Sequence, residues 1–300
     1  LVVSLTDFWF LCPRFTLLKS DGQVCDGPPD GGQGCISCHH PELADIKPDA
    51  HAPPLTTEPE ARAHALLTRK QRQFANLELA DVVFAPSQFL ADMFLANGLQ
   101  HAGFQVVPYG LEKDRIKAIP SERPRQPLRL GFCGVLSPWK GAHLLIEAVR
   151  KSTASVQLTL HGRTEESMFQ DYIDGLQTQA KGDERITFAG AYAEGDAARV
   201  FADMDVLVVP STWYENTPFV MLEAFAAGVP VIASNLGGLS EIVEEDVNGT
   251  VFAANDAKAL QTSIERIAND SSWFAGLNVQ PLAGIAACFD SFDKAYRATS

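Results

Sequence analysis

The sequence predicts an α/β fold whose second half forms a doubly wound parallel sheet. Short apolar runs alternate with helical segments throughout residues 128–280, and strict alternation of this kind is typical of parallel sheets. The 300 residues are enough for two α/β domains of ordinary size. The hydrophobic share of 46% is normal for a globular core.

The expected elements of the second half follow from these runs. Strands are expected at 128–133, 156–161, 186–189, 206–209, 231–233 and 250–252. Helices are expected between and after them, at 141–151, 165–180, 194–202, 218–227, 239–245 and 256–269.

The first half is less regular. Strands are expected at 1–5, 80–87 and 106–110, and helices at 60–79 and 88–97. Ser87 is placed to cap the second of these helices, and Gly98 to end it. Three prolines and alternating charges mark 117–127 as a linker between domains at 1–116 and 128–280.

Charge and hydropathy exclude some classes of partner. The net charge of −13 and pI of about 4.9 argue against nucleic acid as a ligand, because its binding needs a basic surface. No apolar run reaches about 18 residues, so no membrane-spanning helix is expected. We expect a cytoplasmic protein, with peripheral attachment to the inner face of a membrane as the alternative.

The most informative segment is 206–228. An apolar run ends at Pro210, a short loop follows, and Thr217 and Pro218 suit the N-cap and first position of a helix. Glu215 lies in the loop and Glu223 inside the otherwise apolar helix. A helix start is a good place to hold an anionic ligand and its hydroxyl groups.

These residues resemble a known signature. The run E-N-T-P-F-V-M-L-E, followed by G-V-P-V-I-A-S and G-G-L-S-E, is similar to the donor site of retaining glycosyltransferases of the GT-B fold, family 4 (glycosyl transferases group 1). The resemblance implies two Rossmann-like domains facing across a cleft. It also implies metal-independent transfer of a sugar from a nucleotide-sugar, with retention of configuration and no catalytic cofactor.

The resemblance implies a role for each matching residue. Glu223 would accept the ribose hydroxyls, since a carboxylate suits that bidentate task. Glu215, with the backbone N–H groups of Asn216 and Thr217, would contact the transferred sugar. Lys140, just before a helix, would stabilise the departing diphosphate.

Glycine-rich loops supply further candidates for binding the nucleotide. Gly134 follows the first strand of the second half and permits close backbone approach. Gly237 and Gly238 open a later helix, and the backbone N–H groups there are a second candidate site for the phosphates. The family commonly has an arginine where Val135 stands. Arg163 is the candidate to replace that charge, with a surface or interloop ion pair as its alternative role. Tyr192, after the third strand, is the candidate to flank the base, with an ordinary half-buried tyrosine as the alternative.

The N-terminal half departs from the family in two ways. The family often shows H-D-F-W where this chain has Thr6, Asp7, Phe8 and Trp9. The chain also begins on an apolar run without Met, so we expect the start of the acceptor-side domain to be missing and to be needed for transfer. The resemblance further implies that residues 281–300 form a helix returning to that domain.

The N-terminal half also contains a cysteine-rich stretch. Cys12, Cys25, Cys35 and Cys38 lie in a loop rich in proline and glycine. Four thiolates can hold a tetrahedral zinc ion, and a loop without a core would gain from such a link. A structural zinc is therefore predicted, with a disulfide or reduced cysteines as alternatives.

The predicted function is a glycosyltransferase of polysaccharide or glycoconjugate biosynthesis. Its donor would be a UDP-, GDP- or ADP-sugar and its acceptor a glycan, a lipid or another molecule. The alternative is a non-catalytic nucleotide-sugar-binding protein or an inactive fragment of a transferase, which Thr6 and Val135 favour.

Overall fold

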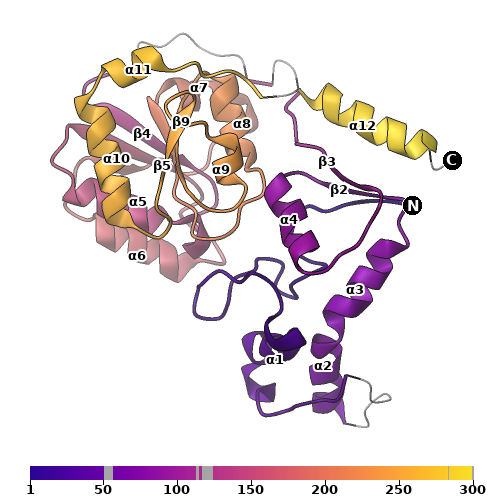
Figure 1. Cartoon of the computed structure of the whole chain (residues 1–300). Coiled ribbons are helices and arrows are strands. Elements are labelled where there is room, and N and C mark those ends of the chain that lie inside the picture. Colours follow the sequence, from indigo (N-terminus) through magenta and orange to yellow (C-terminus); the bar gives the residue numbers. More distant parts are fainter. Residues whose placement is uncertain (51–56, 113–114, 117–123, 283, 299–300) are drawn as a thin grey trace. The chain divides into compact units, whose positions relative to one another are not determined.

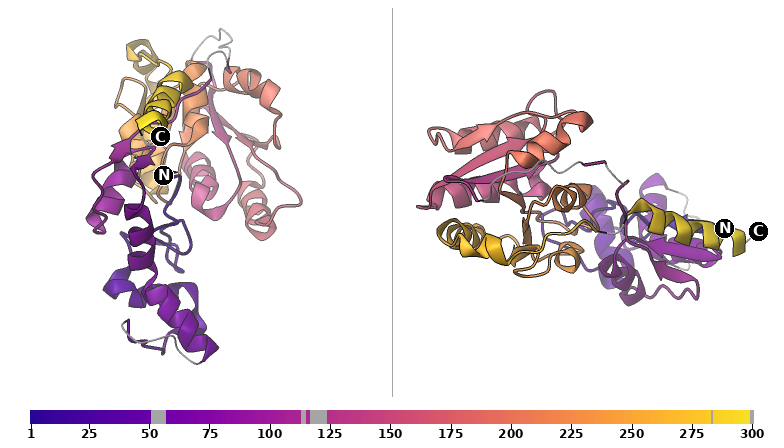
Figure 2. Two further views of the ribbon diagram at one scale, coloured as in Figure 1. Left: turned by 90° about the vertical axis from the view of Figure 1, so that its right-hand side faces the viewer. Right: turned by 90° about the horizontal axis from the view of Figure 1, so that it is seen from above.

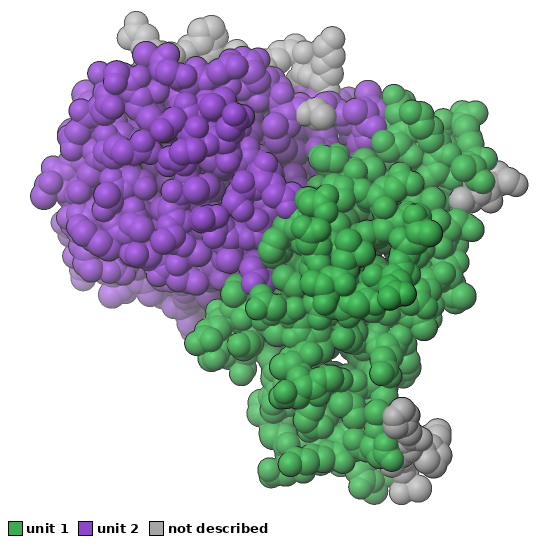
Figure 3. Space-filling model, in the orientation of Figure 1, with its two compact units in different colours: residues 1–108, 289–300 green, residues 109–288 purple. Residues whose placement is uncertain are grey.

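A computed structural model of the chain describes residues 1–50, 57–112, 115–116, 124–282 and 284–298. The chain divides into two compact units, residues 1–108 with 289–300 and residues 109–288 (Figure 3). Each unit contains one open sheet, and all its strands run parallel. The predicted α/β class is confirmed. Most of the predicted linker, residues 117–123, lies outside the described residues.

The second unit contains a six-stranded sheet in the order β6-β5-β4-β7-β8-β9. The strand order reverses between β4 and β7, which pair directly. Ligands of such sheets bind beyond the carboxyl ends of the strands at this switch point. The strands are β4 (Leu128–Cys133), β5 (Val156–His161), β6 (Ile186–Phe188), β7 (Val206–Val209), β8 (Val231–Ser234) and β9 (Gly249–Phe252).

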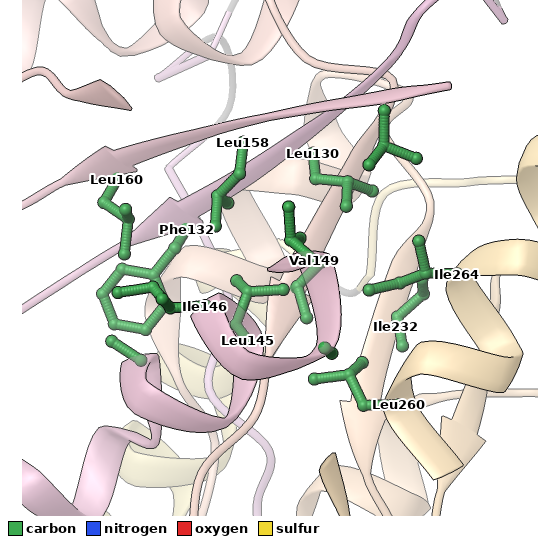
Figure 4. Close-up of a cluster of buried hydrophobic side chains, with 14 of the residues drawn as sticks. Leu130, Phe132, Leu145, Ile146, Val149, Leu158, Leu160, Ile232, Leu260 and Ile264 are labelled. Carbon is green, nitrogen blue, oxygen red and sulfur yellow. The ribbon is translucent and has the colours of Figure 1, made fainter. Parts of the chain in front are cut away.

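Helices cover both faces of this sheet (Figures 1 and 2). One face carries α5 (Ala142–Lys151), α6 (Gln170–Ala180) and α10 (Ala257–Asn269), and Figure 4 shows part of the core beneath them. The other carries α7 (Ala197–Ala202), α8 (Phe219–Ala226) and α9 (Leu239–Ile242). A short helix, α11 (Ser272–Gly276), follows α10.

Alternate residues of a strand serve the two cores. Val206 and Val208 of β7 pack into the first core, whereas Leu207 and Val209 pack into the second. This is the two-residue period of a strand buried on both sides, and it fixes which loops emerge at the carboxyl edge.

Several predicted helix boundaries were wrong. The helix predicted at 165–180 begins only at Gln170, because Glu166 has a positive φ of 51° that interrupts a right-handed helix. The helix predicted from Pro218 begins at Phe219. Pro218 is itself the N-cap, with extended backbone at φ −68° and ψ 122°, so Thr217 is not the cap. The helix predicted at 239–245 ends at Ile242.

The first unit contains a three-stranded sheet in the order β1-β2-β3, from β1 (Val2–Ser4), β2 (Val82–Ala85) and β3 (Phe104–Val106). The hydroxyl of Ser87 accepts a hydrogen bond from the Leu90 N–H at 3.2 Å, which confirms the predicted cap of α4 (Gln88–Ala96). In the last helix, α12 (Ile285–Ala298), the ring centre of Phe292 lies 4.5 Å from that of Phe84.

The single helix predicted at 60–79 is two helices, α2 (Glu58–Leu67) and α3 (Arg69–Glu78). Between them, the hydroxyl of Thr68 donates to the carbonyl of His64 at 2.9 Å, a bond that often accompanies a bend. The cysteine-rich stretch also contains an unpredicted helix, α1 (Gln33–His39), which buries Ile36 against Ala63 of α2.

Candidate functional site

An ion pair joins two loops at the switch point of the six-stranded sheet. Lys140 ends the turn that follows β4, and Glu215 lies in the loop after β7. The Lys140 Nζ is 2.6 Å from Oε1 of Glu215, and the side chains are 26% and 7% exposed. The sequence predicted both residues for the site, and the structure brings them together at its carboxyl edge.

The carboxylate of Glu215 is held by two further donors. The hydroxyl of Ser211 and the indole N–H of Trp213 each donate to the same Oε1 at 2.8 Å. The Lys140 ammonium also lies 5.4 Å from the centre of the Trp213 ring. Charge-assisted bonds of this kind fix the carboxylate in one orientation. Sequence reasoning missed Ser211 and Trp213, although both are polar neighbours of Glu215 in the same loop.

Glycines on two other loops allow the Glu215 loop to pack closely. A Cβ at Gly141 would lie 1.9 Å from the Pro210 carbonyl oxygen, and one at Gly238 would lie 2.0 Å from that of Asn216. The N–H of Gly238 donates to the carbonyl of Glu215 at 2.7 Å. This N–H is therefore bonded within the protein and is not available to a phosphate. The helix that begins after Gly238, α9, has only four residues.

Glu223 lies on α8 in a separate set of contacts. Its Oε1 accepts from Nε of Arg115 at 3.3 Å, and its side chain is 13% exposed. The same guanidinium pairs with the exposed Glu194 at 3.0 Å. Arg115 was not predicted, because it precedes Glu223 by 108 residues in a segment without a recognisable pattern.

The thiol of Cys133 and the phenol of Tyr192 also lie near Glu223. Burial raises the pKa of the Cys133 thiol to about 12, and Cys133 shares a hydrogen bond with Tyr192. Burial is also the largest cause that raises the pKa of Tyr192, followed by its neighbours Cys133 and Glu223. Both groups are thus uncharged at neutral pH beside the Glu223 carboxylate.

A pocket of about 560 Å³ opens beside these groups, over the loops that follow β4, β5 and β6. Gly134, Arg163 and Tyr192, all named from the sequence, line it together with His161 and Met168. Burial lowers the pKa of His161, so its ring is neutral at pH 7. Arg163 is exposed, and no carboxylate among the described residues pairs with it.

The remaining predicted site residues belong to the Glu215 loop or its support. Asn216 and Thr217 directly follow Glu215, and Gly237 lies under it with a φ of 63°. The structure therefore groups Lys140, Glu215 and the two glycines, whereas Glu223 has its own partners.

The four cysteines of the first unit line one cavity of about 280 Å³. Burial and the three neighbouring thiols raise the pKa of Cys35 to about 12, and all six cysteines are free thiols. Within the described residues, no three His, Cys, Asp or Glu side chains are arranged as a metal site. Zinc therefore stays a prediction of the sequence.

Comparison with known proteins finds a family match inside the second unit. Residues 127–270 match the family of glycosyl transferases group 1. This group 1 domain contains the Lys140–Glu215 pair, Glu223 and the pocket over β4, β5 and β6. The match supports the predicted resemblance to glycosyl transferases group 1 over these residues.

Relatives agree with this assignment. An uncharacterized glycosyltransferase of Methanocaldococcus jannaschii is 32% identical over 142 residues, which are 46% of this chain and 35% of that protein. The chain spans about a third of the length of this and the next curated relatives.

Solved structures extend the likeness over about three quarters of the chain. The Anabaena protein HepE, solved with UDP and glucose, has a TM-score of 0.65 at 24% identity, covering 76% of this chain and 67% of that one. Sucrose-phosphate synthase of Thermosynechococcus elongatus has a TM-score of 0.65 at 28% identity, covering 78% and 62%. The predicted GT-B class, built from Rossmann-like domains, is confirmed. No helix in the described residues is long and apolar enough to cross a membrane.

Proposed function

We propose that this chain is part of a glycosyltransferase that moves a sugar from a nucleotide-sugar to an acceptor, with retention of configuration and without a catalytic metal. The observation that carries the proposal is the Lys140–Glu215 pair at the switch point of a group 1 domain. Ligands of open α/β sheets bind at this position.

The nucleotide would occupy the pocket over β4, β5 and β6, with its base beside Tyr192. Glu223 would accept the ribose hydroxyls. One of its oxygens is already held by Arg115 at 3.3 Å, which leaves the other for the ligand and fixes the orientation of the carboxylate. The Gly134 backbone would lie along the nucleotide, where a side chain would obstruct it.

The diphosphate would contact Lys140, and Arg163 would supply a second positive charge. The Lys140 side chain is 26% exposed, so an anion can approach it while Glu215 stays bonded to Ser211 and Trp213. Negative charge grows on the diphosphate as the sugar leaves, so a cation here acts mainly on the transition state.

The transferred sugar would lie against the Glu215 loop. The Glu215 carboxylate and the N–H groups of Asn216 and Thr217 would bind its hydroxyls, and the carboxylate would stabilise positive charge at the anomeric carbon. Gly237 and Gly238 would support this loop from below. HepE has been solved with UDP-glucose, so a UDP-sugar is the first donor to test, before GDP- and ADP-sugars.

Release of UDP from UDP-sugars, with and without candidate acceptors, tests the proposal. We expect release by the wild-type chain within its complete protein and a loss of about 100-fold in Lys140→Met, the usual cost of removing one such group. Glu147→Gln, an exposed change on α5, is the control. Binding of a UDP-sugar without release under any condition would instead support a non-catalytic binding protein.

A further inference from the structure

A second pocket, of about 640 Å³, lies entirely within the first unit, far along the chain from the group 1 domain. It is formed by the start of the chain, α1 and the α2–α3 pair. Among its lining residues are Trp9, His39, Arg69, Arg72, Gln73 and Asn76, and none of its lining residues is acidic.

The two arginines of this pocket carry charges that the protein does not neutralise. Arg69 donates Nη2 to the Trp9 carbonyl, and Arg72 donates Nη2 to the Ala65 carbonyl at 2.8 Å. Neither guanidinium pairs with a carboxylate anywhere in the described residues. Arg62, on the same helix pair, differs, because it lies 3.7 Å from Glu42 and 3.6 Å from Glu58.

One donor of Arg69 is also unsatisfied. Its Nη1 is buried and has no hydrogen-bond partner in the described structure. Burial, followed by the charges of His40, Arg14, Arg69 and Arg62, lowers the pKa of His39. The cationic groups around this pocket therefore act on one another, and a bound anion would relieve their repulsion.

Trp9 gives the pocket an aromatic wall. Trp9 is 49% exposed, and the Arg69 guanidinium lies 4.5 Å from the centre of its ring. This contact and the bond to the Trp9 carbonyl hold Arg69 in place. The positive charge of Arg69 is therefore held at the wall of the pocket, where it attracts a carboxylate or phosphate.

We propose that this pocket, centred on Arg69 and Arg72, binds an oxyanion on the acceptor, so that the acceptor is a phosphate- or carboxylate-bearing sugar rather than a neutral one. That the bound molecule is the acceptor rests on the proposed function. That the pocket binds an oxyanion rests only on the residues of this pocket. The ring of Trp9 would lie against the apolar face of the same sugar.

Binding of three matched probes to the full chain tests the proposal. The probes are glucose 6-phosphate, glucuronate and glucose, measured by calorimetry without any nucleotide. We expect at least one of the two anions to bind and glucose not to bind, and preference between the anions identifies phosphate or carboxylate as the group recognised. Binding should weaken as salt is raised, because the contact is ionic.

Variants on α3 locate the site. Arg72→Gln should weaken anion binding about 10-fold or more, as expected for loss of a charged hydrogen bond. Lys70→Gln is the matched control, because Lys70 carries the same charge on the same helix but donates to the Asn97 carbonyl at 3.2 Å and does not line the pocket. It should change binding less than 2-fold. Arg72 is exposed, so its replacement is not expected to unfold the chain.

Three results would overturn the proposal: no binding of either anion, equal losses in Arg72→Gln and Lys70→Gln, or binding only to vesicles of anionic lipid. Glu223→Gln separates this site from the donor site. Glu223→Gln should leave anion binding unchanged. A loss of anion binding in Glu223→Gln equal to that in Arg72→Gln would show that the anion occupies the nucleotide site instead.

Discussion

The ammonium of Lys140 lies 2.6 Å from Oε1 of Glu215, although the two residues are 75 positions apart in the chain. The pair joins the loops after β4 and β7, the two strands between which the sheet order reverses. It orients the two groups proposed for the leaving group and the transferred sugar before any ligand is present. Preorganised charge of this kind is the usual source of transition-state stabilisation.

Loss of the Lys140 ammonium should destabilise the domain. Lys140→Met leaves Glu215, with a side chain only 7% exposed, without its counter-ion, so we expect a cost on the order of 1 kcal/mol in the free energy of unfolding. Lys151→Met is the control, since Lys151 makes an equally short but exposed pair with Glu147. Its cost should be below about 0.5 kcal/mol. Urea denaturation measures both, and equal costs would contradict the role given to burial.

A methyl group at Gly238 should displace the Glu215 loop. Its Cβ would lie 2.0 Å from the Asn216 carbonyl oxygen, which is backbone and cannot rotate away. Gly238→Ala should therefore lower the free energy of unfolding by about 1–3 kcal/mol and weaken UDP binding. Gly175→Ala on α6 meets nothing within 4 Å and should stabilise the chain by about 0.5–1 kcal/mol. Loss of stability without loss of UDP binding would contradict the loop's role.

His143 should make the chain sensitive to acid. Burial lowers its pKa below the ordinary value of 6.5, and its Nδ1 is 2.8 Å from the Tyr172 hydroxyl. Below pH 6.5 the unfolded state binds more protons than the folded state, so the free energy of unfolding falls as the pH falls, by at most about 1.4 kcal/mol per pH unit for this group. His143→Gln should flatten the profile between pH 7 and pH 5. Parallel profiles would refute this.

The thiol of Cys35 should react slowly with alkylating agents. Its pKa of about 12, raised by burial and by the neighbouring thiols, leaves about one thiol in ten thousand ionised at pH 8, and only the thiolate reacts. Mapping of iodoacetamide labelling by mass spectrometry should show a rate still rising at pH 10. Zinc is measured in the same sample. One ion per chain with protected cysteines would contradict the protonated state and support the zinc predicted from the sequence.

The strands of the second unit could be predicted from the sequence nearly to the residue. The bounds of β4, β5 and β7 agree with the prediction because each apolar or alternating run ends directly before a glycine or proline. Helix starts were less predictable. The delay of α6 to Gln170 depends on the left-handed backbone of Glu166, and no residue pattern announces that conformation. Helix α1 was missed because its single buried residue, Ile36, gives no helical periodicity.

The candidate site was predictable only in part. Lys140 and Glu215 could be expected to meet, because each follows a strand at the carboxyl edge of one sheet. The partner of Glu223 could not be expected, because Arg115 comes from outside the sheet and its contact depends on tertiary packing. The oxyanion pocket likewise depends on Trp9 reaching Arg69, 60 residues later in the chain.

The most direct test of the donor site is thermal stability with UDP, GDP, ADP and their sugars. A ligand at 100 times its Kd adds about 2.7 kcal/mol, enough to raise the Tm by several degrees. One nucleotide should stabilise the wild-type chain selectively, and Glu223→Ala and Lys140→Ala should both lose the shift while Glu147→Ala keeps it. A shift that survives in Glu223→Ala and Lys140→Ala, or no shift with any nucleotide, would contradict a donor site at the carboxyl edge of β4 and β7.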